Sequence, residues 1–183
     1  MSHSTSQPPP LRERIREAPR HTGGEFEEHL EGTAGLVRAW GRSAELERAA
    51  RYHSVYGNFS GRAPIAERQE VAAEIGDAAE RIVWLWSVAD REALTDAALA
   101  ALARGGTGAV ILALADGGAV DVPSAVALEL AHLYAANTLE MAQRSGKPCT
   151  RLDALRPALC PEAVAHLERQ PRKRGLFSWW RER

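Results

Sequence analysis

Apolar residues recur along most of this chain at spacings of three and four, which is the pattern of amphipathic helices. The clearest stretch runs from Gly24 to Trp40. At about 100° per residue its apolar positions gather on one face, together with a threonine whose methyl group can pack among them. That face holds Phe26, Leu30, Thr33, Val37 and Trp40. We therefore predict a helix here, closed by Gly41.

Further helices follow with short connections. Ser43 can cap a second helix that stops at the Gly57-Asn58 turn. A third is predicted over residues 65–76. Asp77 can cap a fourth, which is apolar nearly all round and is therefore expected at the centre of the fold. A fifth should run from Glu92 to Arg104. The inward stripe of the second helix contains Leu46, Ala49, Ala50 and His53.

The pattern changes at TGAVILALADGGAVDVP, where two short β-rich runs flank Asp-Gly-Gly. This favours a hairpin, although a helix through Val110 to Ala115 would satisfy the same apolar content. A long helix should then run from Pro123 to Gly146, and a shorter one from Pro161 to Glu168. Asn137 shares the apolar face of the long helix, whereas His132 lies roughly 140° away from it. That face holds Val126, Leu130, Leu133, Tyr134 and Met141.

These elements predict a mainly α fold, a helical bundle with one small β-hairpin, over residues 11–169. Residues 1–10 are rich in Ser and Pro, and we expect them to be disordered because they bury too little apolar surface to offset the entropy of ordering. Residues 170–183 form a basic and aromatic tail. Such a tail can dock on a partner or an anionic membrane surface, or fold back onto the domain.

Composition narrows the class of protein further. The chain has 183 residues, 45% of them hydrophobic, and a formal net charge of -1, which suits one globular domain and gives no global reason to expect nucleic-acid binding. Cys149 and Cys160 lack zinc-site spacing, so we interpret them as reduced thiols. With no apolar run long enough for a transmembrane segment and no secretion signal, we expect a cytoplasmic protein.

Two histidines on neighbouring helices are the first candidates for chemistry. His29 lies at the edge of the first apolar stripe and His53 within the second, so both should point inward. A buried imidazole must satisfy two nitrogens, and it can do so by binding a metal or by hydrogen-bonding carbonyls and carboxylates. With the inward-facing Asn137, three ligand-type side chains could converge between helices.

The order of these residues resembles the HD superfamily of metal-dependent phosphohydrolases. HTGGEFEEHLEGTAGLVRAWG, HSVYGN, AERIVWLWSVADR and AAN together resemble a small, uncharacterised HD-like family with an H-S-x-Y-G motif. The resemblance to stringent-response nucleotide hydrolases is more distant, and it lies in IGDAAERIVWLWSVADR and LYAANTLEMA. Together these similarities cover about residues 20–145.

The resemblance implies that His29 and His53 occupy the two histidine ligand positions, that Ser54 stands in place of the HD aspartate, and that Asn137 stands in place of the terminal aspartate. Both departures remove a negative charge. Two divalent cations close together need carboxylates to offset their repulsion, so a two-metal centre and the hydrolysis of (p)ppGpp in the usual manner are disfavoured.

A single divalent metal ion, Zn, Fe or Mn, is compatible with this set. His21 can act as a third imidazole ligand. Glu25, one turn before His29, can be a ligand, a hydrogen-bond acceptor behind a ligand, a general base, or only a solvated residue at a helix N-terminus. Tyr56 can position a substrate oxyanion or simply pack its ring. Glu25 and Tyr56 are the candidate catalytic residues.

Other polar groups rank lower. Asp90 and Arg91 can form a local ion pair or present an arginine to an anion. Glu129 and His132 share a face with exposed-type residues, so we rank them below Asn137 as ligands.

Two functions from different classes remain open. One is a metal-dependent enzyme that acts on a small organic or phosphorylated substrate by hydrolysis or oxygenation. The alternative is a metal-free, degenerate HD-like domain that binds a small molecule or a protein partner, with His29 and His53 held by hydrogen bonds.

Overall fold

A computed structural model of the chain describes residues 9–18, 26–57, 63–146 and 152–169. Cys149, the terminal segments and the candidate ligands His21 and Glu25 lie outside these ranges. The described part is mainly helical with one small antiparallel sheet, as the sequence predicted. Its elements are α1 (Leu11–Glu17), α2 (Phe26–Ala39), α3 (Ala44–Tyr52), α4 (Arg68–Ile75), α5 (Asp77–Val88), α6 (Ala93–Ala103), β1 (Ala109–Ala113), β2 (Ala119–Pro123), α7 (Ser124–Ser145), the 3₁₀ turn η1 (Arg156–Ala158) and α8 (Pro161–Glu168).

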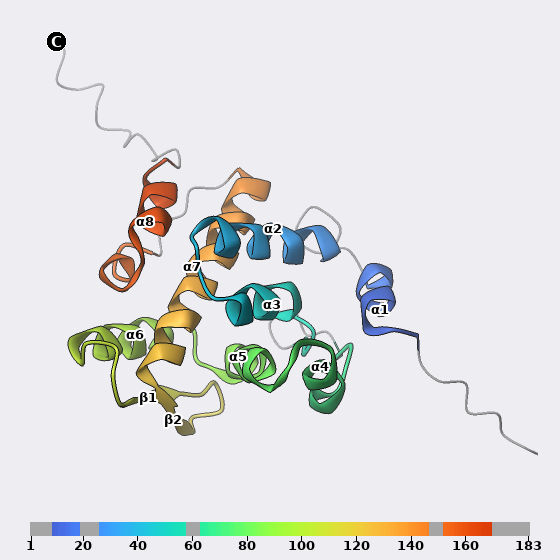
Figure 1. Cartoon of the computed structure of the whole chain (residues 1–183), viewed down its shortest axis with the longest axis horizontal. Coiled ribbons are helices and arrows are strands. Elements are labelled where there is room, and N and C mark those ends of the chain that lie inside the picture. The colour runs from blue at the N-terminus through green and yellow to red at the C-terminus, as the bar shows by residue number, and fades with distance from the viewer. Residues whose placement is uncertain (1–8, 19–25, 58–62, 147–151, 170–183) are drawn as a thin grey trace, which may run out of the picture.

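The long helix α7 runs through the middle of the molecule (Figure 1). It packs against α2, α3 and α5 along its length, against α6 and the hairpin near its N-terminus, and against α8. Helices α2 and α3 lie side by side, and α5 lies beyond α3 with α4 against it. The helix α1 is peripheral and is anchored by its buried Leu11 and Ile15.

The predicted apolar stripes form the core. All five residues of the α2 stripe are buried, and so is the whole α3 stripe, including His53. The Ser43 side chain accepts a hydrogen bond from the Leu46 backbone N at 3.1 Å, which caps α3 as predicted. Gly146 ends α7 with a φ of +64°, a left-handed conformation that a β-carbon disfavours.

The segment after α6 is a hairpin, so the helical alternative through Val110 to Ala115 is wrong. Ile111 pairs with Asp121 and Val110 with Val122, and the buried side chains alternate along β1. The turn uses Gly117 at a φ of +88° and an Asp116 carboxylate that accepts from the Gly118 backbone N at 2.9 Å.

Two sequence predictions need correction. Asp77 does not cap α5: it is the first helical residue after Gly76, and its charge lies in the first turn of the helix, where it is still favourable. The face of α7 that carries His132 is buried, because the start of α8 and Trp40 pack against it: the Cys160 backbone N donates to His132 Nε2, and the Trp40 ring lies edge-on to the imidazole. The sequence pattern did not predict α1 or η1.

None of the described helices combines the length and apolar content that a membrane crossing requires.

Candidate metal centre

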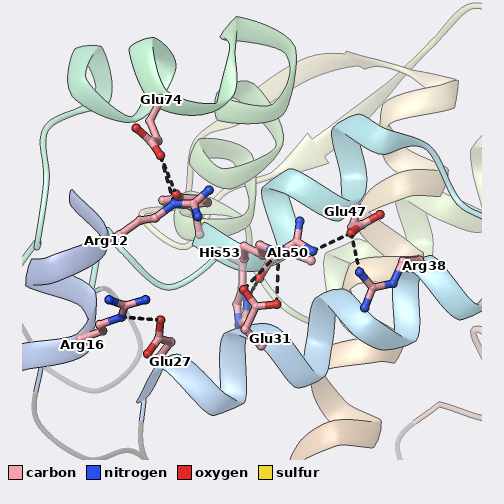
Figure 2. Close-up of polar contacts among 11 residues, drawn as sticks. Arg12, Arg16, Glu27, Glu31, Arg38, Glu47, Ala50, His53 and Glu74 are labelled. Atoms are coloured by element: carbon pink, nitrogen blue, oxygen red, sulfur yellow. Dashed lines mark hydrogen bonds and ion pairs between the residues drawn. The ribbon is translucent and has the colours of Figure 1, made fainter. Parts of the chain in front are cut away.

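Three of the predicted ligands meet between α2, α3 and α7. His29 extends from α2, His53 is the residue that ends α3, and Asn137 lies midway along α7. Figure 2 shows His53 projecting from α3 toward α2. The Nε2 atoms of the two imidazoles lie 3.2 Å apart, and His53 Nε2 lies 3.0 Å from Asn137 Oδ1. Residues separated by more than a hundred positions therefore share one buried point.

The other nitrogen of each imidazole is already committed as a donor. His53 Nδ1 lies 2.7 Å from the Ala50 carbonyl oxygen, which can only accept. His29 Nδ1 contacts a carboxylate oxygen of Glu140. A neutral imidazole carries one N–H, so in neutral His29 and His53 the proton is on Nδ1 and the lone pair is on Nε2.

Two lone pairs and an amide oxygen therefore point toward one another. Such an arrangement is repulsive unless a cation or a proton lies among them. For metal–nitrogen bonds of about 2.0 to 2.1 Å, two ligand nitrogens are about 2.8 to 3.4 Å apart between right-angled and tetrahedral geometry. The observed 3.2 Å falls in that interval, so the side chains present fit a single metal ion. A hydrogen bond through a shared proton fits the same distance.

Glu140 is the site residue that the sequence reasoning missed. It lies three residues after Asn137 on α7 and is 4% exposed, which is unusual for a carboxylate unless it is paired. Its second oxygen contacts Arg144, one turn further along, and Arg144 Nη1 also donates to Glu28 at 3.2 Å. The signal in the sequence was an acidic residue flanked by Leu139 and Met141 on the same apolar stretch as Asn137.

Burial sets the electrostatics of the centre. His29 and His53 are each 1% exposed. Removal from water, with His29 as a second contribution, lowers the pKa of His53 to about 3, so His53 is neutral at physiological pH and keeps its lone pair. The Trp86 ring stands edge-on to His53 with centroids 5.7 Å apart and closes that side. Asn137 alone of the three is half-buried.

Arg91 also packs against Trp86. Its guanidinium stacks over the Trp86 ring at 3.4 Å and donates to the Trp86 carbonyl at 2.7 Å. Burial lowers the pKa of Arg91 to about 9. Asp90 accepts from the backbone N atoms of Glu92 and Ala93 at the start of α6, so its carboxylate serves as a helix cap.

The remaining described histidines contrast with the pair. His132 donates from Nδ1 to the Leu128 carbonyl at 2.7 Å, and its Nε2 accepts from the Cys160 backbone N at 3.0 Å. His166 Nδ1 accepts from Trp40 Nε1 at 2.5 Å. Because its second nitrogen is already used as an acceptor, neutral His132 has no lone pair to offer a metal. Its lower rank as a ligand agrees with this geometry.

Tyr56 has a partner away from the histidines. Its hydroxyl donates to Glu80 Oε1 at 2.9 Å, and Arg68 binds both oxygens of the same buried carboxylate, at 2.7 and 2.8 Å. Burial and Glu80 raise the pKa of Tyr56. The hydroxyl thus holds the end of α3 to α5, and contact of Tyr56 with a substrate stays a prediction.

Among the described residues no three His, Cys, Asp or Glu side chains gather as a metal cluster, so the set there is two imidazoles and one amide. Ser54 is half-buried in the turn after α3, where its carbonyl accepts from the Gly57 backbone N at 3.2 Å. The roles predicted for His21 and Glu25 fall outside the described residues.

Comparison with known proteins adds one similarity. Over residues 10–91 the chain matches the model of a family described as a domain of unknown function, DUF6817. That segment spans α1 to α5 and includes His29 and His53, whereas Asn137 and Glu140 lie beyond it. No curated protein and no solved structure matches the chain.

Proposed function

We propose that this protein binds a single divalent metal ion through His29 Nε2, His53 Nε2 and Asn137 Oδ1. The observation that carries the proposal is the orientation of the two imidazoles: each uses Nδ1 as a donor, to Glu140 or to Ala50, and the two Nε2 atoms face each other at 3.2 Å. A metal-binding imidazole usually donates its other N–H to a carboxylate or a carbonyl. This hydrogen bond fixes the tautomer and raises the basicity of the ligand.

The charge of the site favours one ion over two. Asn137 and neutral imidazoles carry no charge, and among the described residues the carboxylate in contact with this set is Glu140, which is shared between His29 and Arg144. A lone dication can be held by neutral nitrogen and oxygen ligands, whereas a second one would meet uncompensated repulsion. Zn, Fe and Mn all accept such ligands.

We further propose that the domain is a member of the HD-like group and acts on a small organic or phosphorylated substrate, by hydrolysis or oxygenation. A bound ion would supply a Lewis acid at this point. The substrate would approach from the edge of Asn137, which is half-buried, together with the half-buried Tyr134 and Met141 on the same side of α7. The Trp86 ring packs against both His53 and Tyr134.

The alternative is a metal-free domain that binds a small molecule or a protein. The absence of a cluster of three His, Cys, Asp or Glu among the described residues favours it. In that state His29 carries a second proton, balanced by Glu140, and donates it to His53 Nε2.

Metal analysis separates these two functions. Protein purified without a histidine tag should contain close to one equivalent of Zn, Fe or Mn per chain by inductively coupled plasma mass spectrometry. His29→Ala and His53→Ala should each remove it, because each deletes a ligand. His132→Ala is the matched control, a buried histidine whose two nitrogens are already used, and it should keep the metal. Circular dichroism checks that all three variants fold.

Two results would contradict the proposal. The first is sub-stoichiometric metal in the wild type that does not rise after dialysis against each ion followed by removal of the excess. The second is equal metal content in His29→Ala and His132→Ala.

A further inference from the structure

The short helix α8 has a small apolar contact with the rest of the molecule. It lies at the edge of the bundle beside α7 (Figure 1). Its buried residues are Ala163 and Leu167, on one side of the helix. A helix that buries so little apolar surface opens locally more easily than the core helices, so its polar contacts carry more weight in holding it in place. Two of these contacts are made to Trp40, the residue after α2.

Trp40 contacts the chain at both ends of α8. The Cys160 Sγ, just before the helix, lies 3.8 Å from the Trp40 carbonyl oxygen, and His166, in the last turn, accepts at Nδ1 from Trp40 Nε1 at 2.5 Å. Trp40 is 2% exposed. Because an indole N–H can only donate, this hydrogen bond requires a lone pair on His166 Nδ1 and places the proton of neutral His166 on Nε2.

Protonation of His166 removes this hydrogen bond. An imidazolium carries a proton on both nitrogens and accepts nothing, so the buried Trp40 N–H would face a second N–H in place of a lone pair. A buried donor that loses its acceptor destabilises the state that buries it. With α8 in place, His166 therefore binds a proton less readily than it does when the helix is released, and release becomes more favourable as the pH falls.

We propose that the hydrogen bond between Trp40 and His166 is a pH-sensitive switch: it holds α8 against α2 and α7 while His166 is neutral, and it opens when His166 is protonated. Imidazole is the side chain that ordinarily changes charge between about pH 5 and 8, so the switch operates in that range. Release of α8 uncovers Trp40 and also the His132 imidazole, which accepts from the Cys160 backbone N.

Other ionisable groups lie close to this contact. From α7, the His132 ring lies 6.5 Å from the Trp40 ring, and burial lowers the pKa of His132 to about 4, so His132 stays neutral above about pH 5. Arg42, whose charge acts on His132, pairs with Glu129 at 3.2 Å. The charged residues of α8, η1 and their flanks are Asp153, Arg156, Glu162, Glu168 and Arg169. Carboxylates and guanidiniums ordinarily keep their charge above about pH 5, which leaves His166 as the described group that changes charge here.

Amide hydrogen exchange followed by NMR tests this proposal on the full chain. In wild type, the protection factors of the α8 amides should fall at least fivefold between pH 7.5 and 5, after correction for intrinsic exchange. His166→Asn offers an acceptor oxygen that cannot be protonated, and Trp40→Phe keeps a ring without the N–H. In each variant, the protection of α8 should change less than twofold over the same range, because no proton is taken up at this contact or no donor opposes it.

Arg156→Gln is the matched control. It breaks an exposed ion pair with Glu168 at 3.3 Å and should keep the pH dependence of the wild type. Constant protection of α8 in wild type down to pH 5 would overturn the proposal, whether or not the His166 imidazole signals titrate. An equal fall in wild type and His166→Asn would also overturn it, since the loss would then come from another group. His166→Asn decides the question alone if Trp40→Phe does not fold.

Discussion

At the scale of single residues, the position of Glu140 depends on Gly32, which has no side chain to occupy the same space. Gly32 lies on α2 against Glu140 of α7, and a β-carbon at Gly32 would sit 2.9 Å from Glu140 Cγ and 3.1 Å from its Oε1. Real β-carbons essentially never come within 3.0 Å of another atom, so any larger residue would push Glu140 aside. Gly32 thus lets the carboxylate reach His29 Nδ1, and we regard it as a positioning residue for the proposed metal centre.

Gly32→Ala should therefore weaken metal binding through Glu140. We expect a loss of about 10- to 100-fold in affinity, the range typical for losing a group that supports a metal ligand. The fold should not suffer in the same proportion, because alanine is favoured over glycine inside a helix by about 1 kcal/mol. Competition titration with a chromophoric chelator measures the affinity, and thermal unfolding measures the stability.

A matched control lies one turn away. The position of a β-carbon at Gly35, in the same helix, has no neighbour within 4 Å, so Gly35→Ala should change helix stability but not metal affinity. In a Glu140→Gln background, Gly32→Ala should have little further effect, since the interaction that it disturbs is already gone. Equal affinities for Gly32→Ala and wild type would show that Glu140 does not depend on this contact.

At the scale of elements, the sequence predicted the helices α2 to α8, because each presents apolar residues at helical spacing or is bounded by Gly, Pro or a capping residue. It failed for His132, since periodicity identifies one buried face and α7 is covered on several sides. It also could not find Glu140. A buried carboxylate depends on partners such as His29, more than a hundred residues away, and their position is a property of the tertiary packing.

The contact between α4 and α5 depends on a buried carboxylate. Glu80 on α5 is 5% exposed and accepts hydrogen bonds from Nε and Nη2 of Arg68 on α4 and from the Tyr56 hydroxyl. Arg68 also stacks over Trp84 at 4.5 Å. Breaking such a pair costs more than the pair itself contributes, because the remaining charge stays buried without its partner.

Arg68→Gln should therefore lower the free energy of unfolding by about 1.5 to 3 kcal/mol, the range for a hydrogen bond to a charged group. Urea denaturation followed by circular dichroism measures it. Arg38→Gln, which breaks an exposed pair, should cost less than about 1 kcal/mol. In a Glu80→Gln background the cost of Arg68→Gln should shrink, and an unchanged cost would mean that Arg68 acts through Trp84 instead.

At the scale of the whole molecule, the sequence predicted that the two histidines come together, but it did not predict the hydrogen-bond partners of their nitrogens. The sequence brought His29, His53 and Asn137 into one hypothesis because all three lie on inward faces, and the structure places them together. It could not tell which imidazoles keep a lone pair, because that depends on carbonyls and carboxylates supplied by other turns and helices. Ala50, Glu140, Leu128 and Cys160 supply those partners.

The same burial makes the stability of the fold depend on pH. His132 has its pKa lowered to about 4 by removal from water, against about 6.5 in the unfolded chain. Above pH 6.5 His132 is neutral in both the folded and the unfolded state, so it does not lower the free energy of unfolding. Between pH 6.5 and 4 the unfolded chain binds a proton that the folded protein does not, so the free energy of unfolding falls as the pH is lowered. This histidine alone should account for about 3 kcal/mol over that window.

His132→Phe isolates this contribution. The variant should be less stable at pH 7, because the Leu128 carbonyl and the Cys160 backbone N lose their partner. Between pH 6.5 and 4, however, its unfolding free energy should fall less steeply than that of the wild type, by about 1.4 kcal/mol per pH unit. Urea unfolding at half-unit pH steps, with EDTA present to remove any metal contribution, gives both slopes. Carboxylates and His53 titrate in both proteins and cancel in the difference, so parallel slopes would mean that His132 is protonated equally in the folded and unfolded states.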